Sequence, residues 1–323
     1  MEQIFKSIFA DEFNTYLEFS INAGRNVKNI KCYLKNLDSY LIKQNLSTKI
    51  LTEQMLSAWL AEKKISNQSR AHIINILSNF SKYVESMDFK IFLPEKPKVT
   101  SDYVPYIFSD DEIKQIVYAA DNYQGHITPC RSSVQFPIVF RILYGCGLRL
   151  GEALSLTWTN VKTDTGILMI RKAKNQKQRI VPMNQSLNSL LIRYKNYVDS
   201  RGICKDYLFE SKPLVTYKPD TFHEWFTNIL KNAGIKYIKH KLRERGPCPH
   251  CLRHLFTVSS FKKSAASGRT FTDTAPILSA YLGHDSIMET EKYLRASYLI
   301  YDESQAMVNS YIGDIFPQGV TFE

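Results

Sequence analysis

A proline-bearing segment near residue 95 most constrains how this chain can fold. Phe92–Val99 contains two prolines and two lysines, and Pro105 follows shortly afterwards. Proline lacks a backbone N–H and disfavours helix in the residue before it, so we expect an extended linker here. A chain of 323 residues is long enough for two hydrophobic cores. The sequence therefore predicts two domains, residues 1–92 and 108–323, joined by a linker over 93–107.

The first domain is predicted to be helical, because its apolar residues recur three and four positions apart and so share a helical face. This spacing holds in two runs: Ile30, Tyr33, Leu34, Leu37, Tyr40 and Leu41, and then Ile73, Leu77, Phe80 and Val84. Between the runs, a shorter amphipathic helix is predicted within Leu51–Lys63, with Thr52 as its N-cap.

The second domain is predicted to begin with a helix and to contain two short strands further along the chain. Ser109 and Glu112 have the spacing of a capping box, in which each side chain bonds to the backbone of the other residue. Further on, Gly166–Ile170 and Ile180–Pro182 are predicted to be short strands joined by the basic turn Arg171–Arg179. The predicted fold class is therefore mainly α with a small β-sheet (α+β).

Charge and composition narrow the possible functions. The chain has 42 Lys and Arg against 31 Asp and Glu, a net charge of +11, which favours a polyanionic partner such as nucleic acid. It contains no apolar run long enough for a transmembrane helix. Six cysteines are too few for a disulfide scaffold in a chain of this length. We therefore expect a cytoplasmic protein with no membrane partner.

Four short segments carry the functional signal. They are Gly147–Glu152, Lys174–Pro182, His250–His254, and Leu282–His284 followed nine residues later by Tyr293. The order and spacing of these segments resemble the tyrosine recombinase (phage integrase) family. The resemblance covers the whole predicted second domain, and the helical first domain resembles the family's DNA-binding (core-binding) domain.

This resemblance implies both an architecture and an activity. It implies a helical, SAM-like core-binding domain, followed by an integrase-type catalytic domain that ends in a tail helix. The implied activity is site-specific DNA recombination (integration or excision) through a 3′-phosphotyrosyl intermediate, with no cofactor and no metal. The implied partners are double-stranded DNA and, on paired recombination sites, a homo-tetramer. The segment Leu278–His284 further resembles transposon-borne members and favours a mobile element.

Phosphoryl chemistry explains two of the residue choices. Displacement at phosphorus builds negative charge, and paired arginine donors match that charge better than lysine does. Arg149 and Arg253 are therefore predicted to clamp the phosphate. The resemblance implies that Tyr293 is the nucleophile, and its hydroxyl needs a base or a cationic field because its ordinary pKa is near ~10.

The resemblance assigns the other three roles. It implies that Lys174 protonates the leaving 5′-oxygen, that His250 gives acid–base support, and that His284 hydrogen-bonds the phosphate. Lys172 and Lys177 lie in the same turn and are alternatives to Lys174.

Other interpretations stay open at this stage. Arg149 could form a salt bridge with Glu152, and this pair could orient the arginine. Cys248 and Cys251, with His250 and His254 nearby, have the spacing of half a zinc site, although small packing residues would look the same. Alternative functions are a type IB topoisomerase, a DNA-binding regulator without activity, and a zinc-dependent DNA-binding protein.

Overall fold

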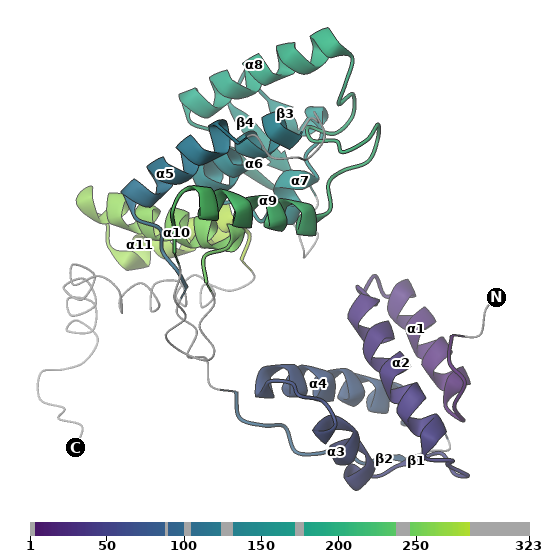
Figure 1. Ribbon diagram of the computed structural model, residues 1–323. Coiled ribbons are helices and arrows are strands. Elements are labelled where there is room, and N and C mark those ends of the chain that lie inside the picture. The colour runs from purple at the N-terminus through teal and green to yellow at the C-terminus, as the bar shows by residue number, and fades with distance from the viewer. Residues whose placement is uncertain are drawn as a thin grey trace, which may run out of the picture. The chain divides into compact units, whose positions relative to one another are not determined.

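The computed structural model describes six stretches of the chain: residues 4–87, 90–99, 105–123, 132–171, 178–236 and 246–284 (Figure 1). The chain divides into two compact units, Met1–Ser101 and Asp102–Glu323. The domain limits at residues 92 and 108 stay predictions.

The first unit is a small helical body, and its predicted helices are confirmed. Its elements are α1 (Ala10–Asn22), α2 (Lys28–Lys43), β1 (Ile50–Leu51), α3 (Glu53–Ala61), α4 (Asn67–Tyr83) and β2 (Lys90–Ile91). Thr52 caps α3 as predicted, because its hydroxyl accepts a hydrogen bond from the Met55 N–H at 3.3 Å. Leu51, in contrast, lies in β1, which pairs in parallel with β2. The unit's core combines aliphatic side chains with aromatic rings, and the Phe13 ring lies 5.1 Å from that of Phe80.

The second unit is larger, and its described residues form helices and a small three-stranded sheet. Its elements are α5 (Asp110–Asp121), α6 (Ser132–Cys146), α7 (Leu150–Leu154), the 3-10 helix η1 (Trp158–Asn160), β3 (Val161–Lys162), β4 (Ile167–Ile170), β5 (Arg179–Pro182), α8 (Gln185–Arg201), α9 (Pro219–Asn232), α10 (Pro249–Ala266) and α11 (Phe271–Leu282). The predicted α+β class is confirmed.

The predicted capping box is also confirmed at the start of α5. The Ser109 hydroxyl accepts from the Glu112 N–H at 3.2 Å, and the Glu112 carboxylate accepts from the Ser109 N–H at 2.8 Å. This reciprocal pair satisfies two of the N–H groups that a helix start leaves without a partner.

The two predicted strands form the antiparallel pair β4–β5, and β3 joins on the other side of β4. Leu168 lies opposite Val181, and both side chains are buried. Strand β3, which is only two residues long, was not predicted from the sequence. Arg179, assigned to the turn, is instead the first residue of β5 and pairs with Ile170. Residues 172–177 of the predicted turn lie outside the described residues.

Helix α6 forms the centre of the second unit. Its residues are mostly buried, and it contacts α5, α7, α8 and α10 (Figure 1). Helix α11 packs in turn on α10 and on β5. As a result, the C-terminal ends of α6 and α11 both approach α10.

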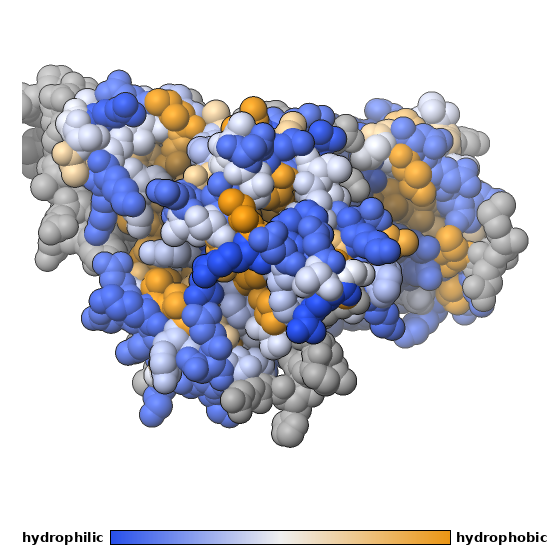
Figure 2. Space-filling model, turned by 90° about the horizontal axis from the view of Figure 1, so that it is seen from above, coloured by the Kyte–Doolittle hydropathy of each residue, from blue (hydrophilic) through white to orange (hydrophobic). Residues whose placement is uncertain are grey.

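The face of the molecule seen in Figure 2 is mostly hydrophilic, with apolar residues gathered in separate patches. None of the helices in the described ranges combines the length and the apolar character needed to cross a bilayer.

Candidate functional site

Arg253 joins three of the four segments that the sequence analysis singled out. It lies on α10, and only 1% of its surface is exposed. Its Nη1 donates to the Gly147 carbonyl at 2.8 Å, and its Nη2 donates to the Leu282 carbonyl at 2.7 Å. The same Nη2 lies 2.9 Å from Nε2 of His284. Residues far apart in the sequence therefore meet around one guanidinium.

Helix ends supply the carbonyls that hold Arg253. Gly147 directly follows α6, and Leu282 is the last residue of α11. The last carbonyls of a helix have no partner within it and carry the negative end of its dipole, so they favour a cation. Gly283 ends α11 in the left-handed conformation, with a φ of 66°, that glycine adopts without strain.

Gly147 is required by space as well as by conformation. Its φ is 61°, and a Cβ built there would lie 2.5 Å from Cδ1 of Phe256. Because Phe256 follows Arg253 by three residues on α10, a larger residue at position 147 would separate α6 from α10 next to the arginine.

Beside Arg253, the Glu152 carboxylate forms ion pairs with two further arginines, Arg149 and Arg179. Arg149 Nη1 lies 3.1 Å from Glu152 Oε1, so the predicted pairing of these residues is confirmed. Arg179 forms a two-point contact with the same carboxylate, at 3.0 Å (Nη1 to Oε1) and 2.7 Å (Nη2 to Oε2). The Arg149 Nη2 also donates to the Gly283 carbonyl at 3.3 Å. Three guanidiniums thus lie around the α11 terminus with one carboxylate among them, and this excess of positive charge suits an anion.

The electrostatics of Glu152 fit this arrangement. Its burial alone would raise the pKa of the carboxyl, but hydrogen bonds and charge from Arg179, then from Arg149, outweigh burial and lower the pKa. Glu152 is therefore ionised at neutral pH and keeps both arginines oriented.

Arg179 is a residue of the cluster that was not predicted as a site residue from the sequence. It is 8% exposed at its side chain, and its Nε donates to the Tyr281 carbonyl at 2.7 Å. Strand alternation was the signal that could have found it. Arg179 and the buried Val181 are two apart on β5, so both side chains face the interior.

His284 is buried next to the arginines and is neutral. Burial lowers its pKa to about 3, and the charges of Arg253, Arg149 and Arg179 act in the same direction. Because arginine can only donate, Nε2 of His284 accepts from Arg253 and its proton resides on Nδ1. His284 therefore lies at the site as predicted, but with Nε2 already engaged by Arg253.

His250 lies one turn before His254 on α10. Its side chain is exposed, and its ring lies 4.7 Å from the buried ring of His254. Burial lowers the pKa of His254 to about 3, with the charges of His250 and Arg253 adding to the effect. The structure thus brings together four of the six predicted side chains, Arg149, His250, Arg253 and His284. The other two, Lys174 and Tyr293, lie outside the described residues.

The cysteines on either side of His250, Cys248 and Cys251, have the geometry of a dithiol. The Sγ atoms of Cys248 and Cys251 lie 3.6 Å apart, and both side chains pack at the core of the second unit. In the described stretches, no group of three or more His, Cys, Asp or Glu side chains is arranged to hold a metal ion.

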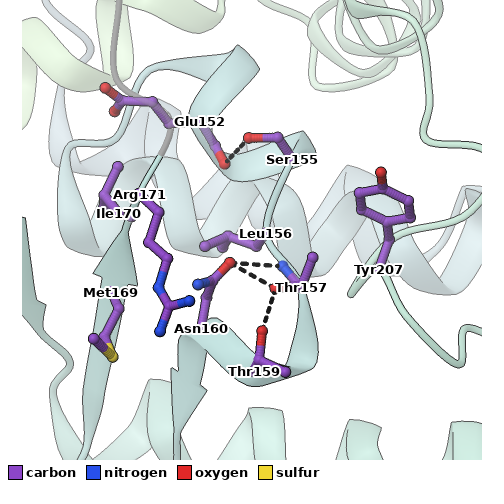
Figure 3. Close-up of a pocket in the computed structure, with 10 residues that line it drawn as sticks. All are labelled: Glu152, Ser155, Leu156, Thr157, Thr159, Asn160, Met169, Ile170, Arg171 and Tyr207. Carbon is purple, nitrogen blue, oxygen red and sulfur yellow. Dashed lines mark hydrogen bonds between the residues drawn. The ribbon is translucent and has the colours of Figure 1, made fainter. Parts of the chain in front are cut away.

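Glu152 also lines a small pocket of about 180 Å³, to which its carboxylate does not point (Figure 3). There the Asn160 Oδ1 accepts from the Thr157 hydroxyl at 2.6 Å and from the Thr157 N–H at 3.3 Å. Figure 3 shows the Glu152 carboxylate pointing away from this polar network. The pocket is thus a neighbour of the arginine cluster and not part of it.

Comparisons with known proteins agree with this geometry. Residues 107–299 match the model of the phage integrase family. A putative integrase/recombinase, y4rB of Sinorhizobium fredii, is 26% identical over 90% of this chain and 94% of its own length. Tyrosine recombinase XerA of Pyrococcus horikoshii is 24% identical over 92% of both chains.

Two solved structures share the fold. A Tn1549 transposon integrase in complex with transposon right end DNA has a TM-score of 0.63 and 14% identity, covering 94% of this chain and 99% of that one. A lambda integrase dimer bound to a core site has a TM-score of 0.62 and 16% identity, covering 88% of this chain and 94% of that one.

Proposed function

The chain belongs to the phage integrase family, and we propose that Arg149, Arg253 and His284 hold the scissile phosphate of a DNA strand. The protein is a tyrosine-type site-specific DNA recombinase. The observation that carries the assignment of residues is the meeting of three distant segments at Arg253, within one cationic cluster.

The cluster suits the charge that develops during strand cleavage. Attack on a phosphodiester adds negative charge to the oxygens of a five-coordinate phosphorus. Fixed guanidinium donors stabilise that charge without reorganising, and they are most effective where water is excluded. Arg149 is the more accessible of the two clamp residues, with 26% of its side chain exposed, and would make the outer contact. Glu152 holds Arg149 in place for that contact.

The remaining steps fall to residues at the edge of the cluster or beyond the described stretches. Tyr293 would attack the phosphorus and form a 3′-phosphotyrosyl bond, while the bond to the 5′-oxygen breaks and Lys174 protonates that oxygen. His250, exposed at the start of α10, would assist proton transfer. Attack by the 5′-hydroxyl of another strand reverses these steps and rejoins the DNA, so no nucleotide cofactor is consumed.

Recombination needs two DNA sites and several copies of the enzyme. We propose a homo-tetramer on paired double-stranded sites, in which the amphipathic tail Tyr298–Ile315 docks on a neighbouring subunit. The net charge of +11 supports binding dominated by phosphate contacts, which weakens steeply as salt is raised.

A two-site plasmid assay tests this function. Two copies of a site that the protein selects from random duplexes are placed on one supercoiled plasmid, and the products are separated on a gel. Recombination predicts that the segment between the sites is excised or inverted, and only when both sites are present. Relaxation of a plasmid with one site or none, without exchange of segments, would contradict the proposal.

A further inference from the structure

The first turn of α10 holds two thiols at the distance expected of a reduced pair. Cys248 is the N-cap of α10, and Cys251 lies in its first turn, with its N–H bonded to the Cys248 carbonyl at 2.9 Å. The 3.6 Å between the sulfurs must shorten to about 2.05 Å in a disulfide. This gap can be closed by side-chain rotation with a small adjustment of the turn.

The two thiols differ in pKa and in exposure, as thiol–disulfide exchange requires of an attacking and a shielded sulfur. Hydrogen bonding from the Cys251 thiol lowers the pKa of Cys248 to about 6 against the opposing effect of burial, and the N–H groups of His250 and Cys251 add to the lowering. The same contact, together with burial, raises the pKa of Cys251. Cys248 is partly exposed, whereas Cys251 is 1% exposed. Cys248 is therefore the accessible, attacking sulfur and Cys251 the shielded one.

The position of the pair connects it to the catalytic cluster. His250 lies between the two cysteines, and Arg253 follows Cys251 by two residues on the same helix. Pulling Cys248 toward Cys251 moves the short segment that carries His250. A displacement of about 1 Å at a catalytic group is enough to slow a reaction by up to ~10²-fold.

We propose that Cys248 and Cys251 are a redox-active dithiol, and that closing their disulfide by exchange with a low-molecular-weight disulfide lowers strand cleavage at the neighbouring site. The effect on cleavage rests on the function proposed above. The exchange chemistry does not.

The reaction balances in two exchanges. The Cys248 thiolate attacks one sulfur of the small disulfide, which forms a mixed disulfide and releases one small thiolate. Cys251 then loses its proton and attacks the Cys248 sulfur, which forms the internal disulfide and releases the second small thiolate. The two cysteines are oxidised by two electrons in total, and the small disulfide is reduced to two thiols, which take up the protons.

Oxidised glutathione is the probe for the chemical test. After incubation of the full-length protein, the reaction is quenched in acid, free thiols are alkylated, and tryptic peptides are weighed. Residues 246–253 form one tryptic peptide that contains both cysteines and no other. In the wild type this peptide should lose the mass of two hydrogen atoms. Cys251→Ser should stop at a glutathione adduct on Cys248, and Cys248→Ser should leave Cys251 unmodified.

The exposed Cys32 provides the matched control, and Cys32→Ser should leave the result on the 246–253 peptide unchanged. The proposal is overturned if this peptide keeps two free thiols under fully oxidising glutathione. It is equally overturned if stoichiometric zinc on the purified protein protects the pair from exchange.

Strand cleavage is then measured on the same samples. Oxidised wild type should cleave about tenfold more slowly than reduced wild type and recover with dithiothreitol. Cys248→Ser should cleave equally fast before and after the glutathione treatment. A closed disulfide with unchanged cleavage would overturn the regulatory claim. Absence of cleavage by the reduced wild type would instead refute the proposed function, and the peptide result would still decide the chemistry.

Discussion

The Arg179 guanidinium and the Glu152 carboxylate form a buried two-point ion pair, with N–O distances of 3.0 and 2.7 Å. The pair ties β5 to α7, and Arg179 extends the link to α11 through the Tyr281 carbonyl. Glu152 also holds Arg149, so this ion pair supports a residue of the proposed phosphate clamp without belonging to the clamp itself.

Removing one partner of this pair should destabilise the second unit. Glu152→Gln should lower the free energy of unfolding by about 3 kcal/mol, because it leaves the buried Arg179 without its carboxylate. Arg179→Gln should cost less, because Arg149 still pairs with Glu152. A double-mutant cycle measured by urea denaturation should give a coupling of about 2 kcal/mol. The exposed pair Asp111 and Lys114 is the control and should show no measurable coupling. Additive effects at Glu152 and Arg179 would show that the pair does not support the site.

The two clamp arginines should respond differently to lysine. Arg149 is partly exposed, so Arg149→Lys should reduce cleavage about 10²-fold while the free energy of unfolding changes by less than about 1 kcal/mol. Arg253 is buried and donates to two helix ends, so Arg253→Lys should lose cleavage and also about 3 kcal/mol of stability. Single-turnover cleavage and urea denaturation measure the two effects. An Arg253→Lys protein as stable as the wild type would contradict the structural role of Arg253.

The protein should lose stability as the pH falls below about 6.5. The pKa values of His254 and His284 are lowered to about 3 in the folded protein, so the unfolded chain binds more protons between these limits. Each histidine should then lower the free energy of unfolding by about 1.4 kcal/mol for each pH unit below about 6.5. Urea denaturation between pH 7 and about pH 5 measures how steeply the free energy of unfolding changes with pH. His254→Gln and His284→Gln should each reduce this slope. A slope unchanged in both variants would contradict the buried, neutral state of these rings.

Gly147 offers a test of the packing between α6 and α10. Gly147 and Gly202 have almost the same φ, 61° and 62°, but of the two only a Cβ at Gly147 would meet another side chain. Gly202→Ala should cost about 1 kcal/mol for the left-handed backbone, and Gly147→Ala about 2 kcal/mol more for the clash with Phe256. Combining Gly147→Ala with Phe256→Ala should cost less than the sum of the single changes. Equal losses for the two glycine variants would refute the close contact.

Local patterns in the sequence predicted much of the fold. The capping box of Ser109 and Glu112, the N-cap at Thr52 and the strand pair β4–β5 all depend on residues close together in the chain. Strand β3 was missed because two residues carry no periodic pattern.

The contacts within the site could not be predicted in the same way. Motif order named Arg253 and His284, but the carbonyls that hold Arg253 lie 106 and 29 residues away in the sequence. Only the packing of α6, α10 and α11 brings these groups together. Arg179 shows the opposite failure, since it was assigned to the basic turn whereas its place on β5 directs its side chain inward.

The central claim is that one tyrosine attacks a DNA phosphate held by the Arg149–Arg253 cluster. A nicked suicide duplex of the selected site traps the covalent intermediate, which a denaturing gel separates and peptide mapping locates. The account predicts a protein–DNA adduct at Tyr293 in the wild type and none in Tyr293→Phe, although the variant still binds the site. An adduct on another residue, or an undiminished adduct in Tyr293→Phe, would contradict it.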